Sequence, residues 1–157
     1  VATMLLAEVY AWYKSRSMNL YQGLIELFNK YGFVKEGIDA FTLKGKEGLE
    51  KISNAMETMR EKSPESFGEF KVSSIYDYKK GYCLNLSDGT TSEINLPKSN
   101  VLYYKMVSRD WFCIRPSGTE PKIKIYYGIS SNSLENAENK LSKFKNEILN
   151  VIRPLLD

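Results

Sequence analysis

The sequence contains no histidine among its 157 residues. Histidine is the commonest general base and the commonest metal ligand in proteins, so any chemistry here proceeds without an imidazole. Only two cysteines occur, Cys83 and Cys113, and they form no C-x-x-C pair. Two cysteines without histidine are too few for an ordinary structural zinc site. We interpret both as reduced, largely buried apolar groups, and their spacing does not support a disulfide.

Long apolar runs are also missing, since every run is far shorter than the ~20 residues of a membrane helix, and no signal peptide is visible. The cytoplasm is therefore the expected location. The 22 basic and 19 acidic residues leave a net charge of +3, which is too small to argue for a nucleic-acid partner. Hydrophobic residues at 43% and charged residues at 26% are typical of a globular chain. The length suits one domain, or one domain and part of another.

Four segments have the apolar spacing of helices, namely about residues 1–13, 19–31, 46–61 and 134–152. Asn19 can cap the second helix, and Asn132 with Glu135 can form a capping box for the last one. The first helix begins inside an apolar pattern without an N-cap. We therefore expect Val1 to be a truncation point, with the surface that covers this helix lying upstream.

The remaining patterned segments indicate strands, at about residues 33–44, 70–78, 82–96, 101–107, 110–115 and 122–129. The segment 82–96 contains the turn Ser87-Asp88-Gly89-Thr90 and is expected to be a hairpin. In the last strand, isoleucines alternate with Lys122, Lys124 and Tyr126, so that the polar residues share one face. The order of strand, helix, several antiparallel strands and helix predicts an α+β domain with helices on one face of an antiparallel sheet.

Turn-forming and anion-binding residue types are concentrated between the last two predicted strands, in the segment RPSGTEPK at 115–122. An arginine supplies a cationic fork that suits phosphate, and serine and threonine hydroxyls can donate hydrogen bonds. A glycine lets backbone N–H groups approach a ligand, and the following lysines add positive charge. The predicted ligands of an anion are Arg115, Ser117, Gly118 and Thr119, assisted by Lys124 and Lys122.

The same residue types also form ordinary turns, in which Ser, Gly, Thr and Pro are frequent. The arginine at the start of the segment and the lysine just after it favour a ligand site over a plain turn. Glu120 is an unexpected neighbour for such a site, because a carboxylate that faced the ligand would repel an anion. We expect its side chain to point away, toward an arginine, a lysine or backbone N–H groups.

The segment RPSGTEPKIKIY at 115–126 resembles the C-terminal phosphate-binding loop of the α-D-phosphohexomutases, the phosphoglucomutase and phosphomannomutase superfamily. The segments LPKSNVLYY at 96–104, DWFCIRPSGTEPK at 110–122 and KYGFVKEGIDAFTLKGKEGLEKI at 30–52 resemble its bacterial phosphoglucomutase branch. One departure is the turn at 108–110, where relatives often have an acidic residue and a glycine before the tryptophan. This departure affects a hairpin and not the phosphate-binding loop.

The resemblance implies a four-domain parent enzyme. Residues 1–34 would be the helical tail of domain three, and residues 37–157 would be domain four, with a TBP-like α+β fold. In this family the catalytic phosphoserine, the acidic Mg²⁺-binding loop and the sugar-specifying loop lie in the first three domains, and no matching segment occurs here. We therefore expect no catalytic residue, no metal ligand and no cofactor in this chain, and no mutase activity from it alone.

The implied activity of the parent is the interconversion of hexose 1-phosphate and hexose 6-phosphate through a phosphoserine and a glucose 1,6-bisphosphate-type intermediate. The expected partners of this chain are a hexose phosphate and the other domains of the parent, without nucleic acid or membrane. Phosphoglucosamine or phosphopentose mutases are alternatives within the family. A nucleic-acid-binding or interaction module is the alternative outside it, but several aromatic residues occupy core-like positions, such as Trp12, Phe28 and Phe144.

Overall fold

The computed structural model describes all 157 residues and has the α+β architecture that the sequence predicts. Its elements in chain order are α1 (Ala2–Ser15), α2 (Leu20–Tyr31), β1 (Phe33–Thr42), α3 (Gly45–Glu61), β2 (Ser66–Phe67), β3 (Phe70–Asp77), β4 (Tyr82–Asn85), β5 (Thr91–Glu93), β6 (Leu102–Met106), β7 (Trp111–Pro116), β8 (Lys122–Ser131), α4 (Leu134–Ile152) and a 3-10 turn (Arg153–Leu155). None of the helices combines the length and the hydropathy needed to cross a bilayer.

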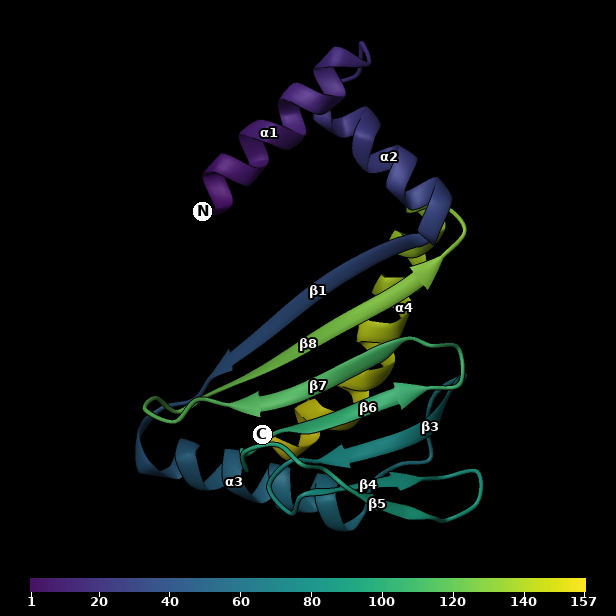
Figure 1. The fold of residues 1–157 in the computed structure, drawn as a ribbon. Helices are drawn as coiled ribbons and strands as arrows, with labels where there is room; N and C mark the ends of the chain where they lie inside the picture. Colours follow the sequence, from purple (N-terminus) through teal and green to yellow (C-terminus); the bar gives the residue numbers. More distant parts are fainter.

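The strands form one twisted antiparallel sheet in the order β1-β8-β7-β6-β3-β4-β5, and the short β2 pairs with β3 outside this path. Figure 1 shows α3 and α4 on one side of the sheet, as expected. Helix α4 contacts β1, β8 and β2, and α3 contacts β8 and the C-terminal 3-10 turn. The other side carries no helix and is called the open face below.

The hydrophobic core lies between the sheet and the two helices. Strand β8 shows how the sequence builds it, because its alternate residues Ile123, Ile125, Tyr127 and Ile129 are all at most 1% exposed. Phe144 of α4 packs edge-on against the rings of Tyr127 and Phe112 from the sheet. Burying such side chains stabilises each by roughly 1.5–3 kcal/mol relative to leaving it in water. Alternation of side chains along the strands therefore leaves the polar positions on the open face.

Helices α1 and α2 project away from the sheet as a pair (Figure 1). Tyr13 is the one buried side chain of α1, and its hydroxyl donates to the carbonyl of Gly23 at 3.3 Å. Trp12 is 55% exposed, so the core-like position inferred from its spacing is wrong. Gly32 ends α2 with a φ of +99°, a backbone conformation that favours glycine, and β1 begins at the next residue. The division of the chain into residues 1–34 and 37–157 stays a prediction.

The structure confirms one predicted helix cap and corrects the other. Asn19 caps α2 in a full capping box with Gln22. At α4, however, the N-cap is Ser133, whose hydroxyl accepts from the backbone N–H of Asn136 at 3.1 Å. Asn132 lies one residue too early and accepts instead from the side-chain amide of Asn136 at 2.8 Å. The helix begins one residue later than the capping-box spacing suggested, because Ser133 has the extended backbone that an N-cap requires.

The two cysteines are free, but they are half-buried and not largely buried as expected. Both lie on the open face, where Cys113 is paired in register with Tyr103 on one side and Tyr126 on the other. Cys113 stands between the apolar residues Phe112 and Ile114 in the sequence, which suggested a core position. The alternation along β7 instead places its side chain on the face opposite the helices. Desolvation raises the pKa of the Cys113 thiol, and the nearby Arg115 opposes this shift.

Candidate phosphate-binding site

Two cations face each other across the open face where β7 and β8 approach the loop that joins them. Arg115 of β7 is the register partner of Lys124 of β8. Like charges directly opposite each other in an antiparallel pair are destabilising, so an anion bound between the two side chains would stabilise this pairing. None of the carboxylates of the chain lies within 4.0 Å of Arg115, Lys122 or Lys124. The sheet therefore presents uncompensated positive charge at this edge.

The loop itself is held by its own hydrogen bonds. The N–H of Ser117 donates to the carbonyl of Lys122 at 2.7 Å, and the N–H of Lys122 donates to the carbonyl of Glu120 at 2.7 Å. The Ser117 hydroxyl oxygen accepts from the N–H groups of Thr119 and Glu120 at 3.4 and 3.3 Å. Ser117 thus braces the turn through its lone pairs, and its hydroxyl proton stays free to be donated to a ligand.

Gly118 lies at an open position of this loop. A Cβ atom added there would meet nothing within 4 Å, and the residue does not have a positive φ. Its N–H has no hydrogen-bond partner in the protein. The glycine is therefore not required by the turn geometry. Gly118 instead provides an unpaired backbone N–H beside the cations, which can donate a hydrogen bond to an anion.

A cavity of about 220 Å³ forms at this place, lined by Arg115, Pro116, Ser117, Gly118, Glu120, Lys122, Lys124 and Tyr126. It brings together every predicted ligand except Thr119, which is exposed and lies outside the lining. Tyr126 is a lining residue that the sequence argument did not assign to the site. The alternation along β8 could have found it, because Tyr126 shares the face of Lys124.

Glu120 lines the same cavity as the cations. The expected ion pair with an arginine or a lysine is not present, since no such partner lies within 4.0 Å of its carboxylate. Three cations and one carboxylate thus border a cavity that also offers a hydroxyl and a free N–H. This combination suits a dianion such as a phosphate ester, to which arginine can donate two hydrogen bonds at once.

No part of the chain gathers three or more cysteine, aspartate or glutamate side chains in a way that could hold a metal ion. The cavity at the loop combines cations and hydrogen-bond donors with the single carboxylate of Glu120. Such a set of groups can bind and orient an anion.

No family model matches the chain. A phosphoglucomutase from one Staphylococcus aureus strain is 34% identical over 119 residues, which cover 76% of this chain and 21% of the relative. The phosphoglucomutase of a bovine strain of the same species is 33% identical over 123 residues, covering 78% of this chain and 22% of the relative. The chain thus spans about one fifth of the length of the curated relatives that it matches.

Among solved structures, the crystal structure of the open form of parafusin, a Paramecium phosphoprotein described as a phosphoglucomutase, aligns with a TM-score of 0.49. The two proteins are 16% identical, and the alignment covers 86% of this chain and 23% of the other. The similarity in sequence to the bacterial enzymes agrees with the segments that resemble their branch. On the strength of those curated relatives, the chain belongs to the phosphoglucomutase family of the α-D-phosphohexomutases.

Proposed function

We propose that this chain is the substrate-phosphate-binding C-terminal domain of a phosphoglucomutase or phosphomannomutase. The observation that carries the proposal is the cross-strand pair Arg115 and Lys124, which has no carboxylate partner and borders the cavity of the loop. A sheet retains two directly opposed cations at a cost, and a bound phosphate would remove that cost. The curated relatives are phosphoglucomutases, which supports a hexose phosphate as the phosphate ester.

In this proposal the cavity grips one phosphate of the sugar while the other end of the substrate reacts elsewhere in the parent enzyme. Arg115 donates from its fork, Lys124 and Lys122 supply charge, and the Ser117 hydroxyl and the Gly118 N–H donate further hydrogen bonds. Thr119 completes the set of ligands if its hydroxyl turns inward when the ligand binds. Each hydrogen bond to a charged group contributes about 1.5–3 kcal/mol, against the cost of desolvating the anion.

This set of phosphate ligands, called the phosphate clamp below, recognises the phosphate group and not the sugar. Phosphoryl transfer from a phosphoserine to hexose phosphate gives a bisphosphate, which must turn so that its other phosphate can return to the serine. The same clamp can then hold either phosphate, which places binding energy away from the reacting centre. In this proposal the phosphoserine, Mg²⁺ and the sugar-specifying contacts belong to other domains of the parent enzyme.

The proposal includes the domain boundaries and the location. Residues 1–34 are the helical tail of domain three, residues 37–157 are domain four, and the enzyme works in the cytoplasm. Rotation of domain four about the junction would close the cleft over the substrate, as in other hinged enzymes. The chain alone is expected to have no mutase activity.

The alternatives differ in the sugar or in the class of ligand. A phosphoglucosamine or phosphopentose mutase would use the same phosphate clamp, since the clamp contacts no sugar-specific group. A nucleic-acid-binding module would need a broad basic surface, whereas the net charge here is +3 and acidic residues are interspersed with the basic ones along the chain. The geometry favours a phosphate ester of a small molecule.

Amide NMR titrations of this chain with glucose 1-phosphate, glucose 6-phosphate and inorganic phosphate test the proposal. We expect shifts centred on residues 115–124 with all three ligands, and their loss in Arg115→Ala. Lys105→Ala is the matched control, because Lys105 is an exposed cation of β6 with no ion-pair partner at the other end of the open face. If both variants lost the shifts to the same degree, net charge alone would explain the binding. Unchanged binding in Arg115→Ala would reject the proposed phosphate site.

A further inference from the structure

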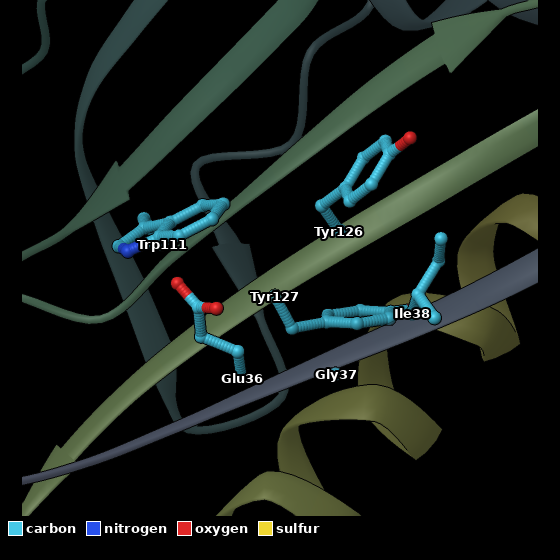
Figure 2. Close-up of a pocket in the computed structure, with 6 residues that line it drawn as sticks. All are labelled: Glu36, Gly37, Ile38, Trp111, Tyr126 and Tyr127. Carbon is cyan, nitrogen blue, oxygen red and sulfur yellow. The ribbon is translucent and has the colours of Figure 1, made fainter. Parts of the chain in front are cut away.

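A second cavity, called the aromatic slot here, lies on the open face beside the phosphate-binding loop. It has a volume of about 330 Å³ and is lined by Glu36, Gly37, Ile38, Trp111, Tyr126 and Tyr127 (Figure 2). Tyr126 lines both this slot and the cavity of Arg115 and Lys124. The two cavities therefore share a wall, and one ligand can extend from the first into the second.

The slot is built by three neighbouring strands. Figure 2 shows the Trp111 ring from β7 and the Tyr126 ring from β8 on two sides of the space, with Ile38 and Glu36 from β1 on the others. The carboxylate of Glu36 is turned toward Trp111. Apolar rings and an aliphatic side chain thus surround a space that has a single charged group.

The indole of Trp111 is fixed in position before any ligand arrives. It lies over Gly128, where an added Cβ would come within 2.2 Å of the indole Nε1. From β6, the ring of Tyr103 stacks on the indole with centroids 5.5 Å apart and an interplanar angle of 22°. A binding surface that is already ordered loses little entropy when a ligand binds. Gly128 and Tyr103 therefore act as positioning residues for the ring.

Glu36 defines what the ligand must present. Its side chain is exposed and forms neither an ion pair nor a hydrogen bond within the chain. An ionised carboxylate only accepts hydrogen bonds, so the part of the ligand in the slot must carry N–H or O–H donors and no negative charge. The phosphate of the ligand belongs in the first cavity, and a ring with donors belongs in the second.

The distance between the two cavities limits which ligands are long enough to occupy both. Trp111 is four residues from Arg115 along β7, which is ~13 Å in a strand, whereas Tyr126 is only ~7 Å from Lys124 along β8. In a hexose phosphate, at most a methylene and an oxygen separate the ring from the phosphate. A hexose held at Arg115 therefore lies near Tyr126 and does not reach Trp111. In a nucleoside 5′-phosphate, a whole ribose separates the phosphate from the base.

We propose that the aromatic slot binds the base of a nucleoside 5′-phosphate whose phosphate occupies the cavity of Arg115 and Lys124. This inference rests on the proposed function of the loop as a phosphate site. The base stacks on Trp111 and Tyr126, because every base offers a π-face to an aromatic side chain. Glu36 accepts hydrogen bonds from the N–H groups at the edge of the base. A nucleotide bound in this way excludes hexose phosphate from the loop and acts as a competitor of the substrate.

A base fits the slot better than a second sugar ring. Four of the six lining residues are hydrophobic, and Glu36 is the one side chain of the slot that carries a charge. A pyranose presents hydroxyl groups around its whole edge, and each buried hydroxyl needs a partner. A base presents two apolar faces and a short donor edge. Guanine, which has a ring N–H and an amino group side by side, suits a carboxylate best.

The test titrates this chain with guanosine 5′-monophosphate, ribose 5-phosphate, maltose 1-phosphate and inorganic phosphate, followed by amide NMR. We expect the nucleotide to bind about tenfold or more tightly than ribose 5-phosphate, as one stacked base provides. Its shifts should include Glu36, Trp111 and Tyr126 besides residues 115–124. Trp111→Ala should remove the extra affinity and leave ribose 5-phosphate binding unchanged. Trp111→Phe, which keeps a ring over Gly128, should retain part of it, and Lys143→Ala, on helix α4 at the other side of the sheet, should retain all of it.

The outcomes separate this inference from the proposed function. Equal affinity for the nucleotide and ribose 5-phosphate, with shifts confined to 115–124, overturns the nucleotide site and leaves the phosphate clamp standing. Absence of shifts with every phosphate ligand overturns both. Binding of maltose 1-phosphate that depends on Trp111, without such binding of the nucleotide, assigns the slot to a second sugar and overturns the inference. An extra nucleotide affinity that survives in both Trp111 variants also overturns it.

Discussion

Arg60 of α3 and Asp77 at the end of β3 form an ion pair in the interior of the protein. The Nε atom of Arg60 lies 3.3 Å from Oδ2 of Asp77, and the two side chains are 1% and 2% exposed. Arg60 also contacts Asn100 and Glu57, and Asp77 accepts from the N–H groups of Lys79 and Lys80 at 3.0 and 3.1 Å. This network ties helix α3 to the middle of the sheet.

Removal of the arginine should strongly destabilise the fold. We expect Arg60→Met to lower the free energy of unfolding by about 3–5 kcal/mol, because it leaves the buried Asp77 carboxylate without a cation, whereas Asp77→Asn should cost less because Arg60 keeps its ion pair with Glu57. The measurement is urea unfolding at neutral pH. Lys143→Met is the control, since the Lys143–Glu69 pair is more than half exposed on both sides and should contribute less than about 1 kcal/mol. Similar losses in the buried and the exposed variants would show that burial of the pair is unimportant.

The N-cap of α4 gives a second prediction with a neighbouring control. Ser133→Ala should cost about 1 kcal/mol, because the N–H of Asn136 loses its acceptor. Asn132→Ala should cost a few tenths of a kcal/mol, since its bond to the side-chain amide of Asn136 is exposed. Urea midpoints of the two variants decide between them. A larger loss in Asn132→Ala would restore Asn132 as the cap that the sequence suggested.

Ionisation of the Tyr104 hydroxyl should make the free energy of unfolding depend on pH in the alkaline range. Desolvation raises its pKa from 10.0 to about 12, and its hydroxyl donates to the carbonyl of Met59 at 3.1 Å. Because the folded state holds this proton more tightly than the unfolded state does, its contribution is complete below pH 10 and is lost as the pH rises toward 12. A shift of this size corresponds to about 3 kcal/mol.

Unfolding free energies measured at pH 9 and pH 11.5 test this prediction. The wild-type chain should lose more stability between these two pH values than Tyr104→Phe does, since the variant has no proton to lose at this position. Other tyrosines titrate in both proteins, so the difference between them isolates Tyr104. An identical pH dependence of the two proteins would contradict the raised pKa.

The planar fork of Arg115 should matter beyond its charge. Arg115→Lys keeps the charge but cannot donate two parallel hydrogen bonds, so we expect the affinity for glucose 1-phosphate to fall about tenfold, the equivalent of one charge-assisted hydrogen bond. Calorimetric titration at two salt concentrations is the measurement. Arg115→Lys and the wild type should lose affinity with salt to the same degree, because their charges are equal. An unaltered affinity in Arg115→Lys would mean that the site uses charge alone.

Much of this fold follows from patterns in the sequence. The period of two along β8 predicts which residues face the helices, and the turn at Ser87-Asp88-Gly89-Thr90 separates β4 from β5. The patterns did not predict β2, because a two-residue strand carries no period. They also misplaced Trp12, whose spacing is that of a buried residue but whose side chain is more than half exposed.

The site could be anticipated only in part. The residues proposed to bind an anion are consecutive in the segment 115–122, so they can be recognised without a structure. The pairing of Arg115 with Lys124 depends on strand register, and the approach of Glu36 to Trp111 depends on the order β1-β8-β7. Such relationships join residues far apart in the chain, which local patterns do not encode.

The junction at Gly32 and the phosphate-binding loop lie at opposite ends of the same strand pair. Phe33 pairs with Ser131 beside the junction, and Thr42 pairs with Lys122 beside the loop. The ten residues of β1 form a lever arm of ~33 Å between them. A rotation of about 5° at Gly32 would move the far end of an arm of this length, and with it the loop, by about 3 Å. The backbone conformation of this one glycine thus determines where the predicted phosphate ligands lie relative to helices α1 and α2, although Gly32 contacts none of them.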